Sequence, residues 1–127
     1  MAKKEFKFYG LTFEEVTALN RDEFIALLPS RERRTVKRGF SDRQKKLLAD
    51  ISAGKKNIKT HDRDMIILPE MVGTTLKVHS GKIFSLLIIE KEMLGHRLGE
   101  FALTRKRLSH SNPGVGSTKS GSAVSVR

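Results

Sequence analysis

The order of apolar and polar residues changes near residue 57, with helical spacing before it and strand-like spacing after it. In the first part, Thr12, Asn20 and Ser41 each stand three residues before a Glu or Gln. In a capping box, the side chains at these two positions bind each other's backbone N–H groups, so the pattern predicts helix starts. The Thr and Ser cases fit the motif, and the Asn case resembles it.

Two stretches, at about 30–37 and 42–53, are expected to be helices. Gly39 and Gly54 follow them, and a glycine there can adopt the left-handed conformation that ends a helix. In the second stretch, the large apolar residues fall on one face and the basic residues lie largely off it. That helix can therefore bury one side on a sheet and present cations on the other.

The second part of the chain predicts three short strands. Residues 58–61 form the first, residues 74–79 alternate between apolar and polar side chains, and the apolar run 83–89 predicts a buried strand. Ser80 and Gly81 lie between the last two strands and supply a tight turn. We therefore expect these two strands to be antiparallel.

The distribution of charge indicates the class of partner. The 127 residues suffice for one small domain and carry a formal net charge of +11. Residues 1–29 have a net charge of −1, residues 30–64 of +7, residues 65–104 of zero and residues 105–127 of +5. A near-neutral centre between basic segments is typical of a folded body that its flanks hold on a polyanion. The alternative is that the Lys and Arg side chains form solvated helix faces.

Composition and spacing argue against several other functions. The chain has no cysteine, and its four histidines are scattered, so we predict no disulfide and no metal site. No apolar run approaches the ~20 residues of a membrane span, and the N-terminus lacks a signal-peptide pattern. Gly73 and Gly81 are too far apart for a phosphate-binding loop, and Ile83 replaces its Ser or Thr. We therefore expect a soluble, cytoplasmic protein with no cofactor and no enzymatic activity.

The chain divides into three parts by composition. We expect an N-terminal helical extension over residues 1–29, a folded domain that binds a polyanion over 30–107 and a tail over 108–127. The tail is rich in Ser and Gly and lacks apolar periodicity, which predicts a segment that becomes ordered only against a partner.

The stretch from Ser80 to Arg105 carries the most specific pattern. It contains, at fixed spacing, Gly81-Lys82, Gly95, Leu98-Gly99-Glu100-Phe101 and Thr104-Arg105. This pattern resembles the signature of the family of small-subunit ribosomal protein nineteen in bacterial numbering, called protein fifteen in eukaryotes. Residues 33–40, 58–63 and 67–73 resemble further blocks of that family, and residues 110–120 resemble its archaeal and eukaryotic form. The short N-terminus favours an archaeal-type member.

The resemblance implies a fold and a set of partners. The fold would be α+β, a small three-stranded sheet with helices on one side and extended basic N- and C-terminal segments. The protein would be a structural constituent of the head of the small ribosomal subunit, binding rRNA beside the protein numbered thirteen in bacteria. The C-terminal tail would reach toward the decoding region and tRNA. No reaction is implied.

Candidate contact residues are the basic clusters and the residues of the signature. For rRNA they are Arg33, Arg34, Lys37, Arg38, Lys55, Lys56, Lys59, Arg63, Lys82, His96, Arg97, Arg105, Lys106 and Arg107. For the tail and tRNA they are Pro113, Gly114, Gly116, Thr118, Lys119 and Ser120.

Some alternatives stay open at this point. Phe40 could stack on a base or form an apolar staple under the neighbouring helix. His96 and Arg97 could present a cation to RNA or simply complete a turn in which Gly95 and Gly99 adopt positive φ, which other residues resist. A free-standing nucleic-acid chaperone or a basic adaptor for an acidic protein would share the charge, but neither would need the glycine pattern of residues 81–105.

Overall fold

The computed structural model describes residues 5–109, which form a small α+β domain. Three short 3₁₀ helices, labelled η, lie between or after the main elements. In chain order the elements are β1 (Lys7–Phe8), β2 (Leu11–Thr12), α1 (Phe13–Ala18), α2 (Arg21–Leu27), α3 (Ser30–Lys37), α4 (Asp42–Ser52), β3 (Ile58–Thr60), η1 (Pro69–Met71), β4 (Thr75–His79), β5 (Phe84–Ile88), η2 (Lys91–Met93) and η3 (Leu98–Phe101).

The helix starts predicted from the sequence are confirmed. The Thr12 N–H donates to the Glu15 carboxylate at 2.7 Å, and the Glu15 N–H donates back to the Thr12 hydroxyl, so the capping box of α1 is complete. The Thr12 N–H also holds the pKa of Glu15 below its ordinary value of 4.5, because the hydrogen bond favours the charged carboxylate. Ser41 and Gln44 cap α4 in the same way.

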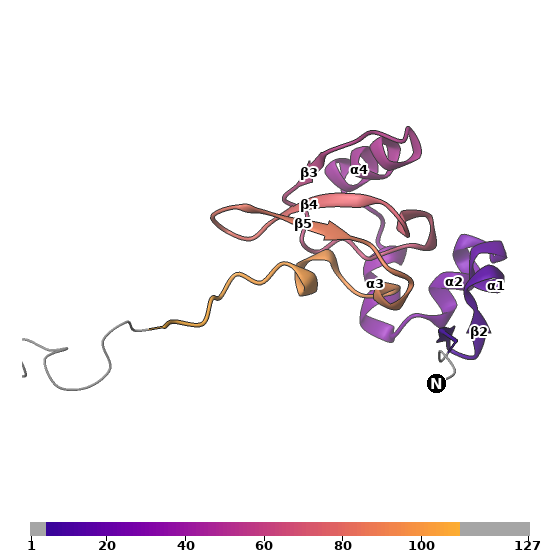
Figure 1. Ribbon diagram of the computed structural model, residues 1–127. Helices are drawn as coiled ribbons and strands as arrows, with labels where there is room; N and C mark the ends of the chain where they lie inside the picture. Colours follow the sequence, from indigo (N-terminus) through magenta and orange to yellow (C-terminus); the bar gives the residue numbers. More distant parts are fainter. Residues whose placement is uncertain (1–4, 110–127) are drawn as a thin grey trace, which may run out of the picture.

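The sheet is mixed and has three strands in the order β3-β4-β5. Strand β3 pairs parallel with β4, and β4 pairs antiparallel with β5. Helix α4 packs behind β3 and covers one face of the sheet, as predicted (Figure 1). The hairpin between β4 and β5 is confirmed, but its turn lies one residue later than expected. The Ser80 N–H donates to the Ile83 carbonyl at 2.8 Å, so Gly81 and Lys82 form the turn.

Residues 83–89 contain a strand as predicted, but only one face of that strand is buried, so the prediction of a buried strand is wrong for the other face. Leu87 and Ile89 are buried, whereas Leu86 and Ile88 are 64% and 57% exposed. Strand β5 is an edge strand of a sheet that is covered by helices on one side only, so alternate side chains point to solvent. A continuous apolar run does not distinguish this arrangement from a fully buried strand.

The centre of the core is an irregular segment, not a helix or strand. Residues 65–68 are at most 1% exposed. They lie along the signature residues 95–98: the Ile67 N–H donates to the His96 carbonyl, and the Leu98 N–H donates to the Met65 carbonyl. These two segments, about thirty residues apart in sequence, are therefore joined by a short ladder of backbone hydrogen bonds.

The N-terminal part is helical as expected, but it is folded onto the domain and begins with a hairpin. Tyr9 and Gly10, both with positive φ, connect β1 and β2, as in the two-residue turns that suit hairpins. The Phe8 ring stacks on Phe24, and Phe24 and Leu28 belong to the same core as the rest of the domain. Residues 7–27 are thus not an extended segment.

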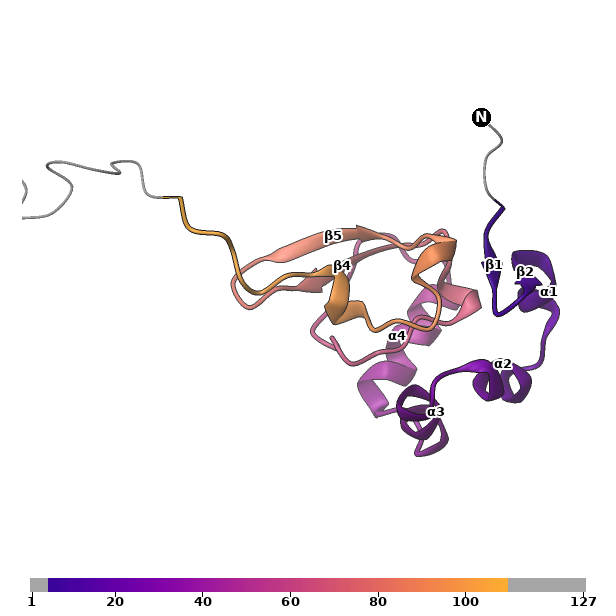
Figure 2. The ribbon, with the colours of Figure 1, turned by 90° about the horizontal axis from the view of Figure 1, so that it is seen from below.

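The two ends of the described chain leave from opposite sides of the molecule. The β1–β2 hairpin and helices α1 and α2 lie beside α3 at one end, and residues 103–109 run away from the sheet at the other (Figures 1 and 2). Within residues 5–109, no helix is long and apolar enough to cross a membrane.

Candidate nucleic-acid interface

The first basic cluster lies at the C-terminal end of α3. Arg34, Lys37 and Arg38 are exposed on the last turn and the C-cap, where the helix dipole favours cations. Arg33 differs from them because it is half-buried and its Nη2 donates to the Leu28 carbonyl at 3.0 Å. The structure therefore offers three of the four predicted side chains to a polyanion and engages the fourth in the fold.

Phe40, which follows this cluster, packs against the hydrophobic core. The structure thus supports the apolar staple rather than a base-stacking role for this ring. Helix α4 begins just after it, and its outward side presents Arg43, Lys45 and Lys46, all exposed. Lys45 also forms a surface ion pair with Asp42.

The second basic cluster surrounds the loop between α4 and β3. Lys55 and Lys56 follow the C-cap of α4, and Lys59 lies on β3; all three are exposed. Lys55 forms an ion pair with Asp50 at the end of the helix. Lys77, absent from the predicted set, is the register partner of Lys59 on β4. Side chains alternate along residues 74–79, so Lys77 lies on the other face of the sheet from the buried Leu76 and Val78. This alternation could have identified Lys77 as a candidate from the sequence.

Arg63, predicted as an RNA contact of this cluster, has a structural role instead. Its Nη1 donates to the His79 carbonyl at 2.6 Å, and its Nη2 donates to the carbonyls of Gly99 and Ala102 at 2.8 and 2.5 Å. The guanidinium thus joins the end of β4 to η3 and the residue that follows it. We therefore remove Arg63 from the candidate contacts, because hydrogen bonds to three carbonyls occupy most of its donors.

Gly99 lies against Arg63, and this contact corrects the predicted reason for the glycine. Its φ is not in the left-handed region, but a Cβ at this position would lie 3.0 Å from both the Cβ and the carbonyl oxygen of Arg63. The Gly99 N–H donates to that same carbonyl at 2.8 Å. Close approach of two backbone segments, and not positive φ, therefore requires glycine here. At Gly95 the prediction of positive φ is confirmed, with a value of 77°.

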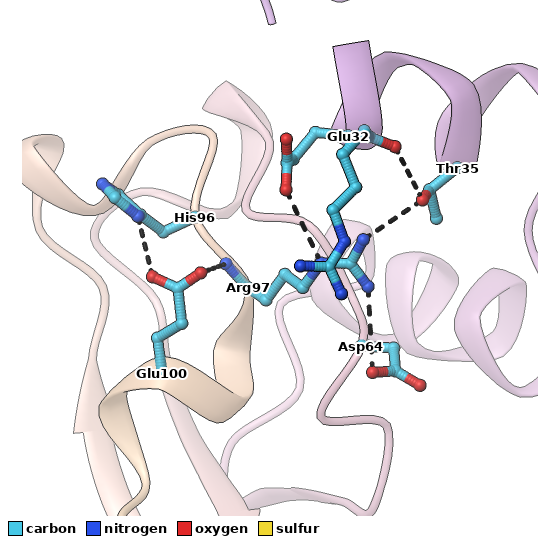
Figure 3. A network of polar contacts seen from close by, with 7 residues as sticks. Glu32, Thr35, Asp64, His96, Arg97 and Glu100 are labelled. Atoms are coloured by element: carbon cyan, nitrogen blue, oxygen red, sulfur yellow. Dashed lines mark hydrogen bonds and ion pairs between the residues drawn. The ribbon is translucent and has the colours of Figure 1, made fainter. Parts of the chain in front are cut away.

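Arg97 lies in a network that connects the signature turn to α3 (Figure 3). Its Nη2 donates to the Thr35 hydroxyl at 3.2 Å, and its guanidinium nitrogens lie 3.8 Å from carboxylate oxygens of Glu32 and Asp64. The Arg97 side chain is only 18% exposed. These contacts favour the structural interpretation of Arg97 over direct presentation to RNA.

His96, next to it, points the other way. Its Nδ1 lies 2.8 Å from a Glu100 oxygen in a pair that is half exposed (Figure 3). The two adjacent residues of the signature turn therefore have different roles. Arg97 connects the turn to α3, whereas His96 stays at the surface beside Glu100.

The remaining predicted residues occupy the hairpin turn and the C-terminal end. Lys82 is exposed between β4 and β5. Arg105, Lys106 and Arg107 are exposed in the segment that leaves the sheet (Figure 1). The predicted tail residues lie outside the described part of the chain: Pro113, Gly114, Gly116, Thr118, Lys119 and Ser120.

The described residues also bear on the other chemistry considered. Across residues 5–109, no group of three or more His, Asp or Glu side chains is placed to hold a metal ion. The exposed cations of α3, of the loop before β3, of the hairpin turn and of the C-terminal segment are the main candidate contacts, and their side chains suit phosphate groups.

Comparison with known proteins gives two concordant matches. A family model described as ribosomal protein S19 matches residues 34–110. The chain is also 48% identical over 125 residues to the small ribosomal subunit protein uS19 of the archaeon Methanocella arvoryzae, an alignment that covers 98% of this chain and 89% of that protein.

Proposed function

This chain belongs to the ribosomal protein S19 family, as an archaeal-type member, and we propose that it helps to build the small ribosomal subunit by binding rRNA through its basic surface. The observation that carries the proposal is the placement of exposed cations around a near-neutral core: Arg34, Lys37 and Arg38 on α3, and Lys55, Lys56 and Lys59 before and on β3. A ribosomal role requires no reaction, because the family consists of structural components.

Binding would be mainly electrostatic. Each phosphate that a Lys or Arg neutralises releases condensed counterions, which makes the affinity for RNA depend steeply on salt. Shape and backbone recognition of folded RNA fits this surface better than sequence-specific recognition, because phosphate contacts position a protein without reading bases. The folded core keeps the clusters at fixed positions relative to one another.

The finer placement of the protein is also part of the proposal. We place it in the head of the small subunit, in the cytoplasm, beside the protein numbered thirteen in bacteria. The segment after Arg107, including Lys119, would extend toward the decoding region and tRNA. The composition of residues 108–127, which contain basic residues and no acid, supports an approach to nucleic acid.

Two variants of equal charge test the rRNA surface. In the first, Arg34, Lys37 and Arg38 on α3 are replaced by Gln; in the control, Arg43, Lys45 and Lys46 on α4 are replaced by Gln. Both remove three exposed cations. Tagged full-length proteins are expressed in an archaeal host, and their occupancy in small subunits is measured after sedimentation at moderate salt.

We expect the wild type and the α4 control to remain with the small subunit and the α3 variant to be depleted. Equal depletion of both variants would mean that net charge alone decides binding. A wild-type chain that leaves the subunit at moderate salt would contradict the proposal and favour a free-standing chaperone or adaptor.

A further inference from the structure

Three aromatic rings, two from strands β4 and β5 and one from the residue after β3, meet on the outer face of the sheet, the face that the helices do not cover. His61 follows β3, His79 ends β4 and Phe84 begins β5. The ring centroids of His61 and His79 are 4.2 Å apart, and the Phe84 ring lies 5.2 Å and 5.0 Å from them. We call these three residues the ring cluster. Because His61 lies far in sequence from the hairpin that carries His79 and Phe84, no local motif reveals the cluster.

The ring cluster is held in place by the backbone around it. The Gly81 N–H donates to Nδ1 of His79 at 3.2 Å, which orients the imidazole. Arg63 donates to the carbonyl of the same residue, and His79 and Phe84 are register partners. The His79 ring is therefore oriented before any ligand arrives, which lowers the entropy cost of binding at this position.

The charge near the ring cluster is positive. The Lys59 Nζ lies 5.5 Å from the centroid of the Phe84 ring, Lys77 is adjacent to Lys59 in register, and Lys82 is exposed in the following turn. Strands β3, β4 and β5 contain no acidic residue. Phe84 remains 37% exposed, so part of the ring is accessible.

From this geometry we infer that the ring cluster is a stacking site for an unpaired RNA base, with Lys59 and Lys82 binding the phosphates on either side of it. The inference rests on the proposed function and adds a second mode of contact to the phosphate-binding surface. Aromatic rings beside cations are the means by which proteins hold single-stranded nucleic acid, since every base has a face on which to stack. The exposed Leu86 and Ile88 continue the same face and would suit a protein partner, but the rings and lysines match the polyanion.

The test uses the isotope-labelled full chain and two probes, a single-stranded oligoadenylate and an RNA duplex of the same length. Phe84→Leu removes the ring and keeps an apolar side chain at an exposed position. Phe84→Trp restores an aromatic surface, and Leu86→Ala is the control on the same strand. Affinities are measured for both probes, and ring-proton shifts of the cluster are followed by NMR, with circular dichroism confirming that each variant is folded.

If an adenine base stacks on the ring cluster, the NMR signals of the cluster's ring protons should move upfield when oligoadenylate is added. Phe84→Leu should weaken oligoadenylate binding by about tenfold and leave duplex binding unchanged, whereas Phe84→Trp and Leu86→Ala should bind oligoadenylate like the wild type. If Phe84→Leu binds both probes like the wild type, the stacking site is refuted while the phosphate-binding surface stands. If Leu86→Ala instead reduces the occupancy of the chain in subunits and Phe84→Leu has no effect, the face binds protein. A wild type that binds neither probe would refute the inference and the proposed function together.

Discussion

Single residues of the same type have different roles in this domain, and the sequence does not separate them. Arg63 and Arg34 both stand in basic stretches, yet the first donates to three backbone carbonyls and the second is exposed. Gly95 and Gly99 both belong to the signature, yet only Gly95 has positive φ. Local sequence reports residue type and spacing, whereas these roles depend on segments that meet only in the fold.

The same substitution should affect different properties at the two arginines: stability at Arg63 and rRNA binding at Arg34. Arg63→Met leaves three carbonyls without a charged donor and should lower the free energy of unfolding by about 2–4 kcal/mol. Arg34→Met should change it by less than about 0.5 kcal/mol, but should reduce the slope of log affinity for rRNA against log salt by about 1. Denaturant unfolding and RNA titrations measure the two effects. Equal stability of both variants would refute the structural role of Arg63.

Gly99→Ala should destabilise the domain although its backbone angle suits alanine. The new Cβ would lie 3.0 Å from backbone and Cβ atoms of Arg63, where little can move. Such crowding typically costs about 1–3 kcal/mol, which thermal unfolding detects. An unchanged melting temperature would show that the backbone segments around Gly99 and Arg63 can move apart without loss of stability.

At the scale of elements, most of the helices and strands could be predicted from the sequence. Capping boxes, cap glycines and strand alternation are local signals, and α3, α4 and the three-stranded sheet follow them. The β1–β2 hairpin was missed because its turn, Tyr9-Gly10, places a tyrosine in the left-handed region that usually takes Asn or Gly. The buried segment 65–68 was missed because its partner lies far away in sequence.

The cap of α1 predicts a small dependence of this element on pH. Because the Thr12 N–H lowers the pKa of Glu15, the cap contributes its full stability above pH 4.5 and loses it as the pH falls through the lowered pKa. An NMR titration of the Glu15 carboxyl should give a midpoint below 4.5 in the folded chain. A midpoint at or above 4.5 would show that the cap does not form.

The two ends of the chain should contribute very differently to stability. Deletion of residues 1–28 removes Val16, Phe24 and Leu28, which are at most 2% exposed in the shared core, so the remaining chain should unfold at ordinary temperature or lose most of its cooperativity. Truncation after Arg107 removes only the exposed Ser109 and Leu108 from the described part and should leave the melting temperature unchanged. Thermal melts of both truncations, followed by circular dichroism, test this prediction. A cooperative and stable fold without residues 1–28 would contradict the claim that these residues belong to the core.

At the scale of the whole molecule, charge is arranged around a neutral centre. Net charges of +7 over residues 30–64 and +5 over residues 105–127 flank a stretch with no net charge that contains the core segment and the signature up to Thr104. The sequence therefore predicts a polyanion as the partner, and membership of a ribosomal protein family agrees with that prediction. It could not predict which cations remain available, because Arg63 and Arg97 turn into the fold and Lys77 joins Lys59 only through the register of the sheet.

The most direct test of the account is the salt dependence of rRNA binding by the isolated full chain. If the exposed cations neutralise about six to ten phosphates, the affinity should fall by roughly 10³–10⁵-fold between 50 and 200 mM salt, and log affinity should be linear in log salt. The α3 variant described above, lacking Arg34, Lys37 and Arg38, should show a slope smaller by about 3. A nearly flat response, or a slope that the variant does not change, would contradict the claim that this surface holds rRNA.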